Sequence, residues 1–168
     1  MTLAPGLTNS VLLAGLEHAQ LERIAAITRV VDAPRGTIVI REGDLLKELY
    51  IIEQGTMKLT MDARLWEGST TLRCIVNVIG PYGAVGWSAL VEPNLATLSA
   101  QAKTDCRLLA INGQRFLGLM DQDPVMGHKV MKALAGLVAD RLEATRQCLL
   151  SEKVADLMRH PVMGRVLV

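Results

Sequence analysis

The hydrophobic positions divide this chain into three blocks with different periods. Residues 9–30 place apolar side chains three and four positions apart, which is the spacing of one helix face. From residue 37 to residue 111 the apolar residues instead fall in short β-branched runs separated by turns. The helical period then returns and is sustained from residue 124 to about residue 150. The pattern therefore predicts a mainly β unit with flanking helices.

The first block is predicted to form two short helices, because Gly15 interrupts it. Asn9 or Ser10 supplies a cap for the first of them. The block ends in a turn around Pro34 and Gly36, after which the period changes from helix to strand.

Six strands are predicted in the middle block, and no helix is interposed that could make parallel βαβ units. The expected strands span residues 37–41, 49–53, 57–62, 70–79, 98–103 and 107–111. Gln54-Gly55 is typical of a hairpin, and Trp66-Glu67-Gly68-Ser69 is predicted to be another turn. Short strands at this spacing favour an antiparallel sandwich or roll.

A glycine-rich stretch at residues 83–91 breaks the strand rhythm. Gly83 and Gly86 are three residues apart, and Ser88-Ala89-Leu90 follows them as a single helical turn would. The amides at the start of a helical turn have no partner within it, so they can hold a phosphate or another anion. The stretch is therefore a candidate anion site.

The third block is predicted to be one long helix that begins at Asp123, as cap, and Pro124. Its apolar stripe repeats close to every 3.5 residues over about three heptads, which is typical of pairing with a second helix. The alternative is that the stripe packs on the β unit. The stripe comprises Met131, Leu134, Val138, Leu142, Thr145 and Leu149. Residues 151–168 are expected to form a short helical tail that stops at His160-Pro161.

Composition and charge narrow the function classes. The chain has 18 Lys and Arg against 17 Asp and Glu, so its net charge of +1 offers no electrostatic case for nucleic acid or an anionic membrane. No apolar run reaches the length of a membrane span, and the N-terminus has no signal-peptide pattern, so a cytoplasmic protein is expected. Cys74, Cys106 and Cys148 are far apart and are expected to be reduced thiols rather than metal ligands.

No catalytic constellation is evident in the sequence. It contains no Walker loop and no evident Ser-His-Asp set or paired carboxylates, so an enzyme is not expected. His18, His128 and His160 are far apart, and solvated or capping roles are expected for them, with no metal site.

The order of the turn glycines resembles the cyclic nucleotide-binding domain of the catabolite activator family, kinase regulatory subunits and gated channels. The residues that carry the resemblance are Pro34-x-Gly36, Glu42-Gly43-Asp44, Gly55, Gly80, Gly83 and Gly86. The resemblance covers roughly residues 10–150. It implies an eight-stranded jelly roll, or double-stranded β-helix, with short N-terminal helices and a long C-terminal helix.

The implied organisation is one domain over residues 1–150 and a tail over 151–168. Within the domain, helices are expected at 8–32, the β-roll at 33–112 and the C-terminal helices at 113–150.

The resemblance also implies that the turn cradles a cyclic phosphate while the C-terminal helix closes over the base. The candidate ligand-binding residues are then Gly83, Gly86, Trp87, Ser88, Ala89, Leu90, Asn94, Leu95, Ala96, Thr97 and Thr145. Two of the family's contacts are missing. Trp87 stands where a glutamate usually holds the ribose, and none of residues 94–96 is the arginine that pairs with the phosphate. Losing such an arginine typically costs about 2–5 kcal/mol of binding free energy.

Three explanations remain open at this point. A cyclic nucleotide (cAMP or cGMP) binds weakly or in an altered pose, with Trp87 stacked on the purine. Alternatively, the pocket accepts another apolar or anionic effector. In the third explanation Trp87 fills the pocket, and the chain is an interaction or dimerisation module that keeps only the fold.

The expected output is regulatory in either of the first two cases. A bound effector would draw the 113–150 helices toward the β-roll and shift a homodimer formed through the 124–150 helix. The catabolite activator family follows this helix with a winged helix-turn-helix, for which the eighteen residues after Leu150 are too few. We therefore expect neither direct nucleic acid binding nor a membrane partner.

Overall fold

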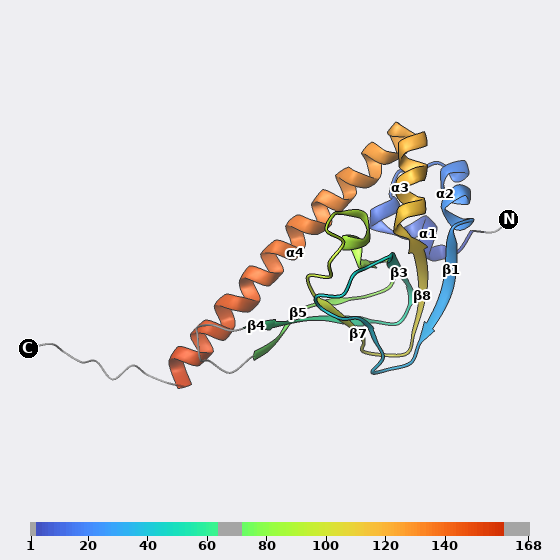
Figure 1. The fold of residues 1–168 in the computed structure, drawn as a ribbon. Coiled ribbons are helices and arrows are strands. Elements are labelled where there is room, and N and C mark those ends of the chain that lie inside the picture. The colour runs from blue at the N-terminus through green and yellow to red at the C-terminus, as the bar shows by residue number, and fades with distance from the viewer. Residues whose placement is uncertain (1–2, 64–71, 160–168) are drawn as a thin grey trace, which may run out of the picture.

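Two four-stranded antiparallel sheets form a β-roll, and helices cover one side of it (Figure 1). The computed structural model describes residues 3–63 and 72–159. The helices are α1 (Pro5–Asn9), η1 (Val11–Leu13), α2 (His18–Ala25), η2 (Trp87–Leu90), α3 (Gly113–Gln122) and α4 (Pro124–Arg159). The strands are β1 (Thr28–Ala33), β2 (Ile38–Ile40), β3 (Glu48–Gln54), β4 (Met57–Ala63), β5 (Leu72–Ile79), β6 (Ala84–Val85), β7 (Ser99–Ala102) and β8 (Cys106–Asn112).

The strand order is that of a jelly roll, which confirms the predicted fold class. One sheet has the order β1-β8-β3-β6 and the other β2-β7-β4-β5. Each pair of neighbours in the two sheets is antiparallel, including β1 with β8, which lie at opposite ends of the roll's sequence. The expected strand at residues 98–103 is shorter, since β7 has four residues.

The first helical block ends earlier than its apolar spacing predicts. Helix α2 stops at Ala25, and Thr28–Ala33 is a strand that pairs with β8 from Thr28 opposite Ile111 to Ala33 opposite Cys106. The boundary expected between residues 32 and 33 therefore lies inside this strand. The β-branched residues Thr28 and Val30 favour an extended backbone, and pairing with β8 stabilises it as a strand. The turn expected at 66–69 lies outside the described residues.

Helix α4 continues beyond the expected end near residue 150. It runs without interruption for 36 residues to Arg159, because residues 151–159 contain neither glycine nor proline. Figure 1 shows it passing diagonally along the β-roll from its start beside α3. Its most extensive contacts are with β5, α3 and η1. The expected stop at His160-Pro161 lies outside the described residues.

Two hydrophobic clusters hold these layers together. One lies between the helices and the β1-β8-β3-β6 sheet, and it includes Leu49, Ile111, Phe116, Val130 and Leu134. The other fills the interior of the roll, between the two sheets, with side chains such as Ile52, Met57 and Leu108. Phe116, the one phenylalanine in the chain, is fully buried and is the one aromatic side chain among the described buried members of the two clusters.

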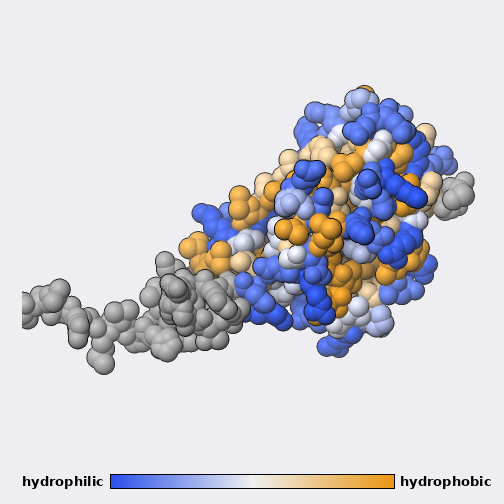
Figure 2. Space-filling view, in the orientation of Figure 1, coloured by the Kyte–Doolittle hydropathy of each residue, from blue (hydrophilic) through white to orange (hydrophobic). Residues whose placement is uncertain are grey.

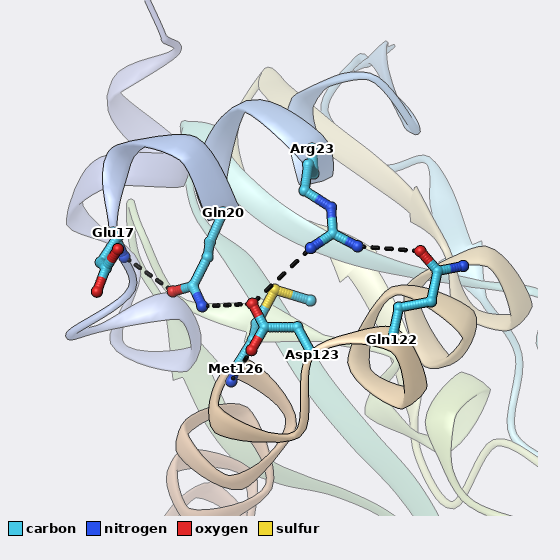
Figure 3. Close-up of polar contacts among 6 residues, drawn as sticks. All are labelled: Glu17, Gln20, Arg23, Gln122, Asp123 and Met126. Carbon is cyan, nitrogen blue, oxygen red and sulfur yellow. Dashed lines mark hydrogen bonds and ion pairs between the residues drawn. The ribbon is translucent and has the colours of Figure 1, made fainter.

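Asp123 joins the start of α4 to the N-terminal helices (Figure 3). Its Oδ1 accepts a hydrogen bond from the Met126 amide at 3.0 Å, and its Oδ2 accepts one from Gln20 Nε2 at 2.7 Å. Arg23 donates to Gln122 Oε1 at 3.1 Å and lies 3.8 Å from the Asp123 carboxylate. The hydrogen bond from the Met126 amide, followed by that from Gln20, lowers the pKa of Asp123. The carboxylate therefore anchors the first turn of α4.

Asp123→Asn is expected to weaken the pH dependence of stability in acid. Because the folded pKa of Asp123 is lowered, its contribution is fully present above the ordinary aspartate pKa of about 4 and is lost as pH falls through the lowered value. Asparagine keeps the cap but not the charge. Urea unfolding between pH 3 and pH 7 should show a smaller loss of stability in the variant than in the wild type. Asp121→Asn, on an exposed carboxylate of α3, is the matched control; identical pH profiles for Asp123→Asn and wild type would contradict this role.

Candidate functional site

The glycine-rich stretch forms a tight turn between β6 and η2. Gly86 has a φ of 78°, in the left-handed region that favours glycine. A Cβ at this position would lie 2.9 Å from Ile40 Cδ1 and 3.2 Å from the Glu48 carbonyl oxygen, so space also requires glycine. The next two residues, Trp87 and Ser88, open η2, and the amides at a helix start have no partner within the helix.

The loop after η2 is held by its own hydrogen bonds. Asn94 has a φ of 60°, and its Nδ2 donates to the carbonyl oxygens of Ser88 at 3.0 Å and Val91 at 3.3 Å. The Leu46 amide donates to the Asn94 carbonyl at 2.8 Å. Leu95 is exposed and bridges to Leu45. Both Asn94 and Leu95 therefore shape the loop.

A narrow hollow of about 30 Å³ lies between this turn, the interior of the roll and α4. We call it the turn hollow. Its volume is well below the range for small-molecule sites, about 300–1,000 Å³, so an organic ligand would require the hollow to widen. Its lining is mostly apolar, and it comprises Ile40, Leu46, Leu59, Val85, Gly86, Trp87, Ser88, Ala96, Thr97, Leu98, Ala100 and Arg141.

The structure brings five of the sequence-predicted ligand residues to the turn hollow. They are Gly86, Trp87, Ser88, Ala96 and Thr97. The other six lie elsewhere. They are Gly83, Ala89, Leu90, Asn94, Leu95 and Thr145.

The residues that miss the hollow have identifiable structural roles. Ala89 and Leu90 are buried in the cluster between the helices and the sheet, because η2 turns them away from the roll. The Gly83 amide donates to the Gly80 carbonyl within the preceding turn. The Thr145 hydroxyl donates to the Arg141 carbonyl at 2.8 Å, within α4.

Arg141 is the functional candidate that the sequence interpretation missed. Its side chain reaches the turn hollow from α4 and is only 9% exposed. Its Nη1 is buried and has no hydrogen-bond partner among the described residues. Burial lowers the pKa of the guanidinium, against a smaller opposing effect of the Asp140 charge. The sequence did contain a signal: Arg141 follows Leu137 by four residues and Leu134 by seven, so all three lie on one face of the helix.

The predicted stripe on α4 divides between the core and the surface. Leu134 is 4% exposed and belongs to the chain's own hydrophobic cluster, so its assignment to a dimer interface is corrected. Val138 also packs against that cluster. Met131 is 38% exposed and Leu142 is 71% exposed, and Figure 2 shows hydrophobic side chains along this outer edge of the molecule. Thr145 and Leu149 are half-buried.

The expectation of reduced thiols is wrong for two of the three cysteines. Cys74 in β5 and Cys148 in α4 form a disulfide, with their Cα atoms 6.5 Å apart. They are 74 residues apart in sequence, so only the packing of α4 on β5 brings them together. Cys106 is a free, buried thiol.

The described residues contain neither a metal-ion cluster nor a membrane-spanning helix. In the segments 3–63 and 72–159, no three His, Cys, Asp or Glu side chains are grouped as a metal ion would require. None of the helices in those segments is long and apolar enough to cross a membrane.

Arg141→Met is expected to leave the ligand-free protein as stable as the wild type or more stable, by about 1–3 kcal/mol. Methionine fills a similar volume and removes a buried cation whose Nη1 has no hydrogen-bond partner in the described part of the chain. Thermal and urea unfolding would measure the change. Arg146→Met removes an exposed arginine of α4 that pairs with Glu143 and should change stability little. A loss of more than about 1 kcal/mol in Arg141→Met would mean that the guanidinium stabilises the fold itself.

Comparison with known proteins places the chain in a family. The model of the cyclic nucleotide-binding domain matches residues 30–123. The CRP-like cAMP-activated global transcriptional regulator of Mycobacterium tuberculosis is 27% identical over 152 residues, which are 90% of this chain and 62% of that protein. The chain thus spans about three fifths of the length of this relative.

Solved structures agree with this match. The catabolite activator protein of Thermus thermophilus superposes with a TM-score of 0.62 at 26% identity, over 88% of this chain and 64% of that one. The N-terminal domain of a transcriptional regulator from Streptomyces coelicolor A3(2) shares the fold, with a TM-score of 0.66 over 83% of this chain and 94% of that one, at 24% identity. The matched segment contains both strand layers and the turn at Gly86, and the chain belongs to the cyclic nucleotide-binding domain family.

Proposed function

We propose that this chain is a small-molecule-sensing regulatory domain whose effector is a compact anion bound in the turn hollow. The observation that carries the proposal is the buried Arg141 side chain, which lines the same hollow as Gly86, Trp87 and Ser88. Its Nη1 has no hydrogen-bond partner within residues 3–63 and 72–159. A buried cation is costly unless an anion or acceptor accompanies it. An anionic effector would supply that partner.

The turn and the arginine would share the anion between them. Arg141 offers paired N–H donors, which suit the two oxygens of a carboxylate or phosphate. Ser88 lines the same hollow, and its hydroxyl would add a neutral donor. Charge-assisted hydrogen bonds of this kind are stronger in a dehydrated site than at the surface.

The position of this cation differs from the usual family pattern, in which the phosphate arginine follows the turn. Residues 94–96 provide no arginine here, and Arg141 comes from α4 instead. Contact between the effector and Arg141 would therefore hold α4 against the β-roll. An effector that binds one position of α4 more tightly than another shifts the population toward it, which is the requirement for signalling.

The walls of the hollow restrict the effector to a partly apolar molecule. Ile40, Leu59 and Leu98 are among its apolar lining residues, and the described lining contains no aspartate or glutamate that could accept a ribose hydroxyl. The chemistry of this lining suits a small organic acid or phosphate ester, which would require the hollow to widen as it binds. A cyclic nucleotide, cAMP or cGMP, would bind weakly or in an altered pose, with Trp87 available to stack on the purine.

A thermal-shift screen tests the proposal directly. Cyclic AMP, cyclic GMP, cyclic dinucleotides, inorganic phosphate and a set of aliphatic and aromatic carboxylates would each be added to the full chain. A ligand present at 100 times its dissociation constant should raise the free energy of unfolding by about 2.7 kcal/mol. For any ligand found, Arg141→Met should weaken binding by roughly 30-fold to several thousand-fold.

Arg146→Met is the matched control for the binding loss, because Arg146 is an exposed cation of the same helix. An equal affinity in Arg141→Met and wild type would contradict the assignment of the cation. No shift with any compound would favour the alternative in which the chain is a dimerisation or interaction module that keeps only the fold.

We also propose that two copies pair through α4. The support is the exposed apolar edge formed by Met131 and Leu142, eleven residues apart and therefore on one side of the helix. Val138 and Leu149 lie along the same edge and are half-buried. In such a dimer each turn hollow would lie against one helix of the pair. An effector that moves α4 in one copy would therefore alter its contact with the other copy.

Leu142→Glu is expected to shift the protein from dimer to monomer. A charge in the middle of an apolar helix pair loses the burial of leucine and adds the desolvation of a carboxylate. Analytical ultracentrifugation over a range of concentrations would give the dissociation constant, with an expected increase of roughly 10-fold to 1,000-fold. Lys132→Glu, about 80° round the helix axis from Leu142, is the control and should leave the dimer intact. A wild type that sediments as a monomer throughout would contradict the pairing.

A further inference from the structure

The Cys74–Cys148 disulfide joins α4 to the edge of the β-roll. Cys74 lies in β5, which is the last strand of its sheet, and its side chain is 1% exposed. Cys148 lies in α4 and is half-buried. The bond is a covalent link between the roll and the helix that carries Arg141.

The linked cysteine and the buried arginine share one face of α4. Cys148 follows Arg141 by seven residues, which is two helical turns or about 10 Å along the axis. Leu134 precedes Arg141 by the same interval and is buried. A bond at Cys148 therefore restrains the face of α4 that places Arg141 at the turn hollow.

One sulfur of the pair is open to attack by a small thiol. An open surface hollow of about 470 Å³ borders Cys148 and is lined in part by Ile75, Gln147 and Ser151. Cys74 is buried beneath it, so an incoming thiolate reaches Cys148 first. Thiol–disulfide exchange depends on which sulfur is accessible, and accessible bridges are the more labile ones.

Cys106, the third cysteine, takes no part in the disulfide. Its thiol is buried and lies 3.3 Å from the carbonyl oxygens of Thr56 and Thr104, within the roll. It is unpaired, and Cys74 and Cys148 already bond to each other.

We propose that Cys74 and Cys148 form a thiol–disulfide exchange site that sets how firmly α4 is held on the β-roll. In the reductive direction a glutathione-type thiolate bonds to the Cys148 sulfur, and Cys74 leaves as a thiolate and takes up a proton. A second thiolate then attacks the sulfur of the small molecule in the mixed disulfide, which frees Cys148 and yields one low-molecular-weight disulfide. The chain gains two electrons and two protons, and the small thiols lose them.

The two redox states would differ in the freedom of α4 rather than in the fold of the roll. In the oxidised state the helix is fixed at Cys148 and at the Asp123 anchor, with Arg141 between these points. In the reduced state the part of α4 beyond Arg141 depends on non-covalent packing alone. Access to the turn hollow would then be easier, so the redox state would regulate the proposed sensor.

Thiol counting tests whether the exchange takes place. The native full chain would be equilibrated with reduced or oxidised glutathione, quenched, denatured and labelled with a maleimide. We expect three labelled cysteines after reduction and one, Cys106, after oxidation. The Cys148→Ser variant keeps Cys74 and Cys106. Once mixed disulfides with glutathione have been removed, both should be labelled after either treatment. Three labelled cysteines after oxidation, or one after prolonged native reduction, would overturn the proposal.

Hydrogen exchange tests the effect on α4. Amides over residues 141–151 should exchange roughly tenfold faster or more in the reduced protein than in the oxidised protein. The Cys74→Ser/Cys148→Ser double variant should match the reduced rates without any reductant, while α3 serves as the unchanged reference. Equal exchange rates in the oxidised protein, the reduced protein and the double variant would overturn the proposal that the disulfide restrains α4. Neither measurement uses a ligand, so a failed ligand screen and a failed redox switch are distinguishable.

Discussion

Packing of α4 on the β-roll buries most of the Arg141 side chain, including Nη1, and this buried charge governs the chemistry of the turn hollow. Val130 and Leu134, on the same face of the helix, are buried in the cluster between the helices and the sheet. Their apolar burial favours the docked helix, whereas the desolvated cation opposes it. The position of α4 is thus a balance that an anion in the hollow would shift toward docking.

The ends of the docked segment are fixed by different kinds of contact. At its start, Asp123 accepts hydrogen bonds from the α4 backbone and from Gln20 of α2. Near Cys148 the helix is bonded covalently to β5. The first contact depends on a carboxylate that stays ionised above strongly acidic pH, whereas the second depends on redox conditions. The proposed effector would act between them, at Arg141.

Membership of the cyclic nucleotide-binding domain family accounts for the roll and the turn, while the chemistry within the turn differs from the family pattern. Gly86 keeps the backbone geometry, because a side chain there would meet Ile40 and the Glu48 carbonyl. Trp87 and the loop at 94–96 do not provide the usual glutamate and arginine. Backbone shape and ligand chemistry are therefore separable in this fold: the first depends on a single glycine and its neighbours, and the second on side chains that another element can supply.

Local sequence determined those features that depend on neighbouring residues alone. The strand periods, the turn at Gly86 and the start of α4 at Asp123 follow from alternation, positive φ and capping, all of which act within a few residues. Tertiary structure decided the rest. Thr28–Ala33 became a strand because β8 lies beside it, and Leu134 was buried because α4 docks. Arg141 and Cys148 met their counterparts across 41 or more residues of chain. No local pattern encodes such contacts, since they exist only once distant elements pack together.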